Sequence, residues 1–255
     1  TGGSGMKQIV QHLKSGKTEA IDVPVPALES GHLLIRTSRT LISPGTERML
    51  LQFGRAGLIG KARQQPEKVK DAINKIKTDG IGATVEAISS KLDKPLPLGY
   101  CNVGRVVGIG SAIEGFSIGD RVVSNGPHAE FVSVPINLCA KVPDDVTDDE
   151  AVFTVIGSIA LHSVRLCQPT LGENFCVMGL GLVGLLTVQI LMANGCHVIA
   201  SDFDAERLKI AKSLGVKVVD LSQSEVDIIR NCDQFTFGRG IDGVVIAAQT
   251  TSNQS

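Results

Sequence analysis

The first 150 residues place apolar side chains in short runs that glycine, proline and asparagine interrupt. Short alternating runs between turn residues predict β-strands. We expect strands at residues 7–13, 19–23, 32–40, 103–109, 121–124 and 129–134. Many short strands with frequent turns are typical of a barrel-like β domain, which should span residues 6–150.

Residues 48–94 interrupt this strand pattern. Pro66 suits the start of a helix, and Ile73 and Ile76 follow at helical spacing. Asp79 could cap a second helix. The sequence therefore predicts a helical insert, which either packs its own apolar stripe or forms a lid or a contact between subunits of a homo-oligomer.

After residue 150 the pattern changes to alternating strands and helices. A helix over residues 151–166 should come first. Strands are then expected at 175–178, 197–201, 216–220 and 243–248, with helices at 182–193, 204–215 and 224–231. This alternation predicts a parallel sheet with right-handed crossovers, and so an α/β domain over residues 151–255.

A glycine fingerprint of the form GxGxxG, at Gly179, Gly181 and Gly184, lies between the first strand of this domain and its helix. Gly179 allows a tight turn, Gly181 lets the backbone approach a pyrophosphate, and Gly184 permits close packing of helix on strand. With Leu182 and Val183 they open a helix whose free N–H groups and dipole attract phosphate. The spacing predicts a dinucleotide site; the alternative is a glycine-rich turn that binds nothing.

An acidic residue, Asp202, follows Gly184 by 18 positions at the end of the next predicted strand. A carboxylate there accepts hydrogen bonds from the adenosine ribose hydroxyls and repels a 2′-phosphate, so NAD is favoured over NADP. Arg207 could either reach the adenosine ribose or phosphate or remain a solvated helix residue, which leaves NADP open.

Charge and composition narrow the class of partner. The 255-residue chain has 25 Lys and Arg against 26 Asp and Glu, whereas a nucleic-acid surface needs clustered excess cations. We therefore expect a small-molecule substrate and no nucleic acid. The longest apolar stretch, residues 180–192, is too short to span a bilayer, so no membrane partner is expected.

The cysteines and the first residues bear on where the protein works. The six cysteines form no CxxC pair and several lie within apolar runs, as expected of reduced thiols in a cytoplasmic protein. Residues 1–5, Thr-Gly-Gly-Ser-Gly, are typical of an expression-tag remnant and are excluded from the fold.

Four further stretches, at residues 44–47, 99–107, 119–123 and 129–132, read PGTE, GYCNVGRVV, GDRVV and AEFV. They resemble the CGTD, GHE…GVV, GDRV and AEYV segments of the medium-chain dehydrogenase/reductase family. With the glycine fingerprint, the resemblance covers nearly all of residues 7–255. It implies a GroES-like β domain followed by a Rossmann domain, and NAD(P)-dependent oxidoreductase activity.

The positions of that family's catalytic zinc ligands are altered in this chain. Pro44 stands at the Cys position beside Ser43, Tyr100 at the His position, Cys101 at the adjacent Glu, and Val155 near the third ligand. Proline and valine cannot bind zinc, which needs sulfur, imidazole or carboxylate ligands. The four-cysteine structural zinc lobe is absent as well, so the sequence predicts no zinc.

A narrower resemblance covers residues 77–100. They look like the dehydrogenase-like half of bacterial two-part oxidoreductases, in which a glucose–fructose-oxidoreductase-type domain follows. The resemblance implies a C-terminal fused oxidoreductase domain and sugar chemistry in cell-surface polysaccharide synthesis. Four of the six strands of a dinucleotide fold precede Ser255, so the Rossmann domain is expected to be truncated.

Without zinc, another group must polarise or protonate the substrate oxygen. Tyr100, the only tyrosine, would act as general acid or base, or it fills the vacated metal cavity. Thr46 matches the family's proton-relaying hydroxyl or caps a turn, and Glu47 is expected to orient that turn. His128 and His162 are expected to be packed or surface histidines.

The sequence thus favours a zinc-independent NAD(P)-dependent oxidoreductase that transfers hydride to or from a carbonyl or alcohol, such as a sugar derivative. Two alternatives stay open. One is a quinone or enone reductase, and the other is a non-catalytic nucleotide-binding module that supports a fused or partner enzyme.

Overall fold

The computed structural model describes residues 5–13, 15–48, 94–223 and 226–248. The chain divides into two units, Thr1–Phe153 and Thr154–Ser255, close to the domain boundary expected at residues 150 and 151. The predicted helical insert at 48–94 lies almost wholly outside the described residues. None of the described helices is long and apolar enough to cross a membrane.

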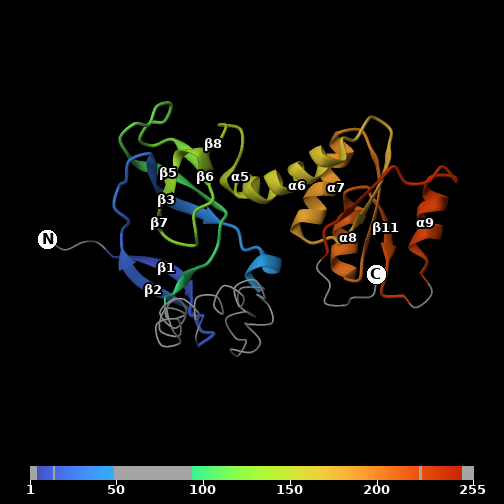
Figure 1. Ribbon diagram of the computed structural model, residues 1–255, viewed down its shortest axis with the longest axis horizontal. Helices are drawn as coiled ribbons and strands as arrows, with labels where there is room; N and C mark the ends of the chain where they lie inside the picture. The colour runs from blue at the N-terminus through green and yellow to red at the C-terminus, as the bar shows by residue number, and fades with distance from the viewer. Residues whose placement is uncertain (1–4, 14, 49–93, 224–225, 249–255) are drawn as a thin grey trace, which may run out of the picture. The chain divides into compact units, whose positions relative to one another are not determined.

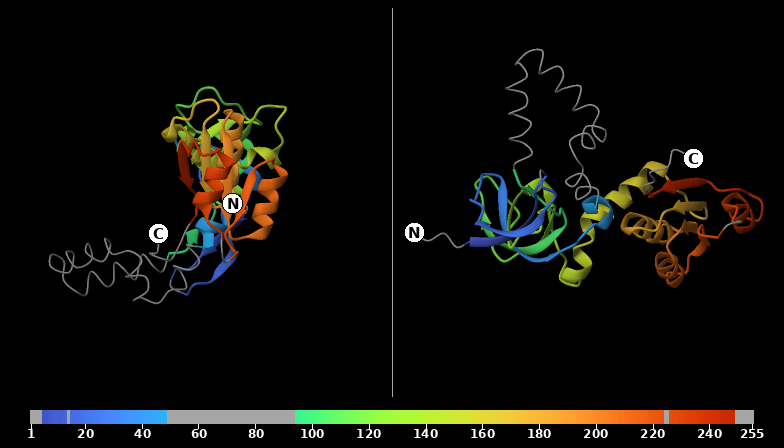
Figure 2. Two further views of the ribbon diagram at one scale, coloured as in Figure 1. Left: turned by 90° about the vertical axis from the view of Figure 1, so that its right-hand side faces the viewer. Right: turned by 90° about the horizontal axis from the view of Figure 1, so that it is seen from below.

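The first unit contains two antiparallel sheets (Figure 1). One has the strand order β2-β1-β4 and the other β7-β3-β5-β6-β8. Their strands are β1 (Gly5–Gln11), β2 (Thr18–Pro24), β3 (His32–Thr40), β4 (Leu96–Pro97), β5 (Asn102–Ile109), β6 (Arg121–Ser124), β7 (Phe131–Pro135) and β8 (Cys139–Lys141). A 3₁₀ turn, η1 (Ile136–Leu138), joins β7 to β8. Figure 2 shows the same strands, in blue to green, from two further sides.

All six strands expected in this unit are present, and the short strands β4 and β8 add to them. Buried and less buried residues alternate along these strands, as the sequence pattern predicted. In β3, Leu33 and Ile35 are buried, and Leu34 between them is only partly buried. They pack with Val106 and Val122 from the neighbouring strands, and this shared apolar face holds the larger sheet together.

The prediction of one helix at 151–166 is wrong in two respects: the helical segment starts earlier, and it consists of two helices. A short helix, α5 (Asp148–Ala151), precedes α6 (Thr154–Cys167). The Thr147 side chain accepts from the Glu150 N–H while the Glu150 carboxylate accepts from the Thr147 N–H. This capping box fixes a helix start that apolar spacing alone did not indicate.

The second unit is a parallel sheet of strand order β11-β10-β9-β12 with helices between the strands, as predicted (Figure 1). The strands are β9 (Asn174–Met178), β10 (His197–Asp202), β11 (Lys217–Asp220) and β12 (Gly243–Ile246), and the helices are α7 (Leu182–Ala193), α8 (Ala205–Ser213) and α9 (Ile228–Phe235). The helix expected at 224–231 begins later, because the Asp227 carboxylate caps α9 by accepting from the N–H groups of Ile229 and Arg230.

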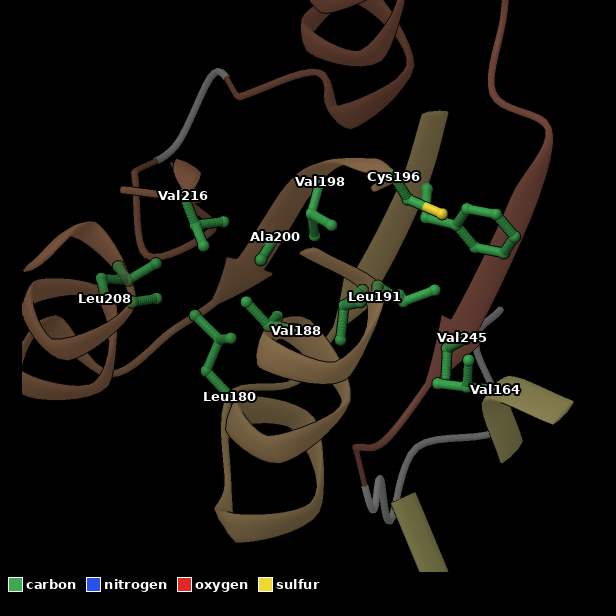
Figure 3. Close-up of a cluster of buried hydrophobic side chains, with 13 residues drawn as sticks. Val164, Leu180, Val188, Leu191, Cys196, Val198, Ala200, Leu208, Val216 and Val245 are labelled. Carbon is green, nitrogen blue, oxygen red and sulfur yellow. The ribbon is translucent and has the colours of Figure 1, made fainter. Parts of the chain in front are cut away.

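Helices cover both faces of this sheet. Figure 3 shows Val188 and Leu191 of α7 packed among Val198, Ala200 and Val245 from the strands. On the opposite face, a smaller cluster brings residues of α9 against alternate positions of the same strands: Cys176, Ile199, Val219, Ile228, Cys232 and Phe235. Burial on both faces explains why the strands read as continuous apolar runs. The helix α7 is apolar nearly all round because it packs against α6 as well as against the sheet.

Gly184 and Gly157 provide a matched pair for testing how closely α7 approaches the glycine turn that follows β9. A Cβ on Gly184 would lie 1.8 Å from the Gly179 carbonyl oxygen, whereas a Cβ on Gly157 of α6 meets nothing within 4 Å. Gly184→Ala should destabilise the second unit by about 1–3 kcal/mol, because the backbone must shift. Gly157→Ala should stabilise its helix by about 0.5–1 kcal/mol. Urea unfolding followed by circular dichroism checks both, and equal effects would contradict the close approach.

Candidate functional site

The turn between β9 and α7 has the geometry that a dinucleotide-binding turn requires. Gly179 has a φ of +94°, and a Cβ there would lie 2.8 Å from the Ala248 backbone nitrogen. Gly181 is different, because a Cβ at this position meets nothing within 4 Å. One glycine therefore serves the turn, and the other leaves an open approach to the backbone.

The N-terminus of α7 leaves its amide groups uncapped. Gly181 occupies the N-cap position, provides no side-chain hydrogen bond, and no carboxylate lies in the first turn. The first N–H groups of a helix have no partner within the helix, and the helix dipole places positive charge there. The backbone at Leu182 and Val183 can therefore bind an anion, and the residues present fit a pyrophosphate.

Asp202 lies at the end of β10 with 8% of its surface exposed. Its Oδ2 accepts from the Leu180 N–H at 2.6 Å, inside the glycine turn. Its Oδ1 accepts from the N–H groups of Phe203 at 2.7 Å and Asp204 at 2.9 Å. The carboxylate thus ties the end of one strand to the turn that follows its neighbour, a role that the spacing of Asp202 in the sequence did not reveal.

The charge on Asp202 is stabilised by these donors. Burial raises the pKa of its carboxyl, but the backbone N–H of Leu180, that of Asp204, the Arg207 charge and the Phe203 N–H outweigh it, and the pKa lies below its usual value. Asp202 is consequently ionised at neutral pH. A fixed anion at this edge of the sheet can accept hydrogen bonds and repels a second anion.

Arg207 of α8 lies beside this carboxylate. Its Nη1 is 3.5 Å from Asp202 Oδ2, and its Nε is 3.7 Å from Asp204 Oδ2. About half of its side chain is exposed. The structure therefore brings Arg207 to the predicted cofactor residue Asp202 and pairs its charge with two carboxylates.

In the first unit the two candidate catalytic hydroxyls come together. Thr46 is exposed on a helical turn at residues 44–48, and half-buried Tyr100 precedes β5. Thr46 Oγ1 and Tyr100 OH are 3.3 Å apart, a distance at which either can donate to the other. Two residues 54 positions apart in the sequence thus form one hydroxyl pair.

A buried acid–imidazole pair includes Glu47, the residue that follows Thr46 in the chain. His128 Nε2 is 3.2 Å from Glu47 Oε1 and 3.3 Å from Glu47 Oε2, and both side chains are buried. Glu47 Oε1 also accepts from the Ser43 N–H at 2.9 Å, which orients the turn as expected. His128 was expected as a packed or surface residue; it is packed, and its carboxylate partner was missed. His162, on α6, is exposed.

No metal centre forms among the residues that the structure describes: no three His, Cys, Asp or Glu side chains converge there. Cys101 is buried, and the six cysteines, all of them among the described residues, form no disulfide with one another. Burial, followed by the neighbouring Cys232, raises the pKa of the Cys176 thiol to about 12, and burial raises that of Cys139 to about 11. These two thiols stay protonated at neutral pH, which makes them poor nucleophiles and poor ligands.

Known proteins resemble this chain over part or most of its length. Residues 183–255 match the family described as zinc-binding dehydrogenase. The chain is 28% identical over 176 residues to (R,R)-butanediol dehydrogenase of Bacillus subtilis (strain 168), a match that covers 58% of this chain and 50% of that enzyme. The chain therefore spans about half the length of this curated relative.

Solved structures share the fold of this chain. A mycobacterial quinone oxidoreductase is 26% identical with a TM-score of 0.67, covering 94% of this chain and 66% of that one. A short chain alcohol dehydrogenase from Escherichia coli CFT073, complexed with NADH, has the same fold at 20% identity, with a TM-score of 0.73 and coverage of 98% and 71%. The chain is thus similar to the zinc-binding dehydrogenase family over residues 183–255, and to named dehydrogenases and oxidoreductases over a larger part of its length.

Asp202→Asn tests the bond between the carboxylate and the glycine turn. Because the pKa of Asp202 is lowered in the fold, its contribution to stability is complete above the unfolded value of about 3.9 and disappears as pH falls through the lower folded value. The variant should therefore be less stable than the wild type at pH 7, and the difference should shrink on acidification. Urea midpoints at several pH values measure it.

Asp149→Asn is the matched control for this experiment. Asp149 is exposed and pairs with Arg39 on the surface, so its replacement should change the unfolding free energy by less than about 0.5 kcal/mol. A difference between the Asp202→Asn variant and the wild type that stays constant with pH would contradict the assigned role of the charge.

Proposed function

We propose that this chain belongs to an NAD(P)-dependent oxidoreductase that transfers hydride to or from a carbonyl or alcohol. The observation that carries the proposal is the uncapped start of α7 behind an open glycine turn, with the Asp202 carboxylate fixed beside it. The similarity to named dehydrogenases and oxidoreductases supports it.

The second unit provides the residues that would hold the dinucleotide. The backbone at Gly181, Leu182 and Val183 would bind the pyrophosphate, and Asp202 would accept from the adenosine ribose hydroxyls. The bound nicotinamide supplies the hydride chemistry. Asp202 makes NAD the favoured cofactor, while Arg207 leaves NADP as the alternative.

The reaction is proposed to be independent of zinc. Pro44 and Val155 have no ligand atoms, and Tyr100 stands where the related dehydrogenases place a histidine. The described residues therefore do not fit a catalytic zinc, in spite of the family's description. The proton would instead be held at the Tyr100 hydroxyl and passed through Thr46 Oγ1, 3.3 Å away.

The substrate is proposed to be a sugar derivative. This rests on the resemblance of residues 77–100 to two-part oxidoreductases, which also implies a fused C-terminal domain and a function in surface polysaccharide synthesis. A cytoplasmic location, consistent with six cysteines that form no disulfide with one another, and assembly as a homo-oligomer belong to the same proposal.

A quinone or enone reductase is the second candidate. The similarity to a mycobacterial quinone oxidoreductase favours it. A panel of quinones, enones and sugar-derived alcohols, each offered with NADH or NAD, separates the two reactions. Cofactor binding without turnover of any substrate would instead indicate a nucleotide-binding module.

Titration of the full-length gene product with NADH and NADPH tests the cofactor site. Two like charges 4 Å apart repel by roughly 1–4 kcal/mol at effective dielectric constants of 80 to 20, so NADH should bind about tenfold tighter or more. Asp202→Asn should lower this ratio, because it removes the charge. Any disturbance of the glycine turn affects both cofactors and cancels in the ratio. Tighter NADPH binding by the wild type would overturn the assignment.

Tyr100→Phe tests the proton donor. In the full-length enzyme, assayed with a strong chelator present, turnover should fall by about 10²–10⁴ while the affinity for cofactor stays nearly unchanged. Phenylalanine keeps the ring, so a melting temperature near that of the wild type separates lost chemistry from lost folding. Unchanged turnover would leave Tyr100 with a packing role, and loss of wild-type activity on chelation would contradict the zinc-independent reaction.

A further inference from the structure

His128 is enclosed by the two segments that carry the hydroxyl pair. Only 6% of its surface is exposed. Its ring packs directly on Gly99, where an added Cβ would lie 2.6 Å from the ring atoms. Its backbone N–H donates to the Leu98 carbonyl at 2.7 Å. On the other side, its Nε2 faces both oxygens of the buried Glu47 carboxylate.

The contacts of His128 lie one residue away from each hydroxyl. Glu47 follows Thr46 in the helical turn, and Gly99 precedes Tyr100 in the segment before β5. The imidazole therefore sets the separation of the two segments at the point where Thr46 Oγ1 meets Tyr100 OH. Gly99 has a φ of +88°, so it combines an unusual backbone conformation with the absence of a side chain, and both leave room for the ring.

The polarity of the site shows that the ring does more than fill space. A carboxylate removed from water needs donors, and Glu47 receives one from the Ser43 N–H and one from His128. The other ring nitrogen, Nδ1, is buried without a hydrogen-bond partner. A hydrophobic side chain would fill this space without leaving a buried nitrogen unpaired, but it would give Glu47 no donor, so the ring differs from a space-filling group in the hydrogen bond that Nε2 makes.

We propose that His128 is a positioning residue that holds Thr46 and Tyr100 within hydrogen-bond distance through Glu47 and Gly99. Its Nε2–H donates to the Glu47 carboxylate, which fixes the 44–48 turn, while the ring supports the backbone before Tyr100. The positioning of the two hydroxyls does not depend on the proposed function, whereas its effect on turnover rests on that function.

The chain contains its own reporter of this geometry. Tyr100 is the only tyrosine and there is no tryptophan. A tyrosine-labelled sample of the 255-residue chain therefore shows the ring signal of this single residue in NMR spectra. His128→Leu, which fills the space without a donor, should shift this signal. His128→Gln, whose amide can donate to Glu47, should restore it. His128→Asn is too short to reach Glu47 and should behave like the leucine variant.

Arg121→Met is the matched control. Arg121 forms a partly buried ion pair with Asp148 in the same unit and also donates to the Val146 carbonyl, away from the hydroxyl pair. It should lower stability without moving the Tyr100 signal. If His128→Leu does not fold, the Tyr100 signals of His128→Gln and His128→Asn are compared instead, and this comparison tests the proposal.

Turnover provides the second readout, in the full-length gene product. A small misplacement of reacting groups costs about 10²-fold in rate. His128→Leu and His128→Asn should therefore lower kcat by roughly 10–100-fold with KM for the cofactor unchanged, and His128→Gln should recover most of the rate. An unmoved Tyr100 signal in both impaired variants, or an equal loss of rate in Arg121→Met, would overturn the proposal. A wild type without oxidoreductase turnover would instead refute the proposed function, and the NMR comparison would still decide the position of the hydroxyls.

Discussion

The Asp202 carboxylate is the constraint on which the second unit depends. It is buried and charged at the end of β10, and such a group is tolerated only when hydrogen bonds replace the water it has lost. Three backbone N–H groups and a nearby guanidinium do so. One of these N–H groups belongs to Leu180, within the glycine turn, so satisfying the carboxylate also holds the turn. The amides at the start of α7 are left without side-chain partners, ready for a ligand.

The elements of this unit could be predicted well from the sequence because burial on both faces of the sheet makes its strands continuously apolar, and α7 is apolar because it lies between the sheet and α6. Both ends of α7 were placed correctly, since a glycine turn precedes it and a glycine follows it. The errors fell where a side chain, rather than apolar spacing, determines a helix start. Asp227 caps α9, which begins after the start that the apolar pattern predicted, and Thr147 caps α5, which begins before it. The Thr147–Glu150 spacing is that of a capping box, a signal that lies outside the apolar pattern.

The candidate site also has residues that the sequence indicated and contacts that it did not. Resemblance indicated Thr46 and Tyr100 one at a time, and the hydrogen bond between them requires the folded β domain. The His128–Glu47 pair joins residues 81 positions apart, and neither residue lies in a pattern that points to the other. Spacing can identify groups that act within one turn or one βαβ unit. It cannot identify contacts that depend on how β-strands are brought together.

The Thr46–Tyr100 hydroxyl pair and the buried His128–Glu47 pair are physically connected. A metal ion polarises an oxygen through its charge, which acts over a range of directions and distances. A neutral hydroxyl acts through a hydrogen bond, which weakens steeply as its angle departs from linear. In the proposed zinc-independent reaction, the loss of metal ligands at positions 44 and 100 therefore demands more accurate placement of the groups that remain. A buried carboxylate held by a backbone N–H and an imidazole provides that accuracy, because the cost of leaving it unpaired opposes any movement of the 44–48 turn.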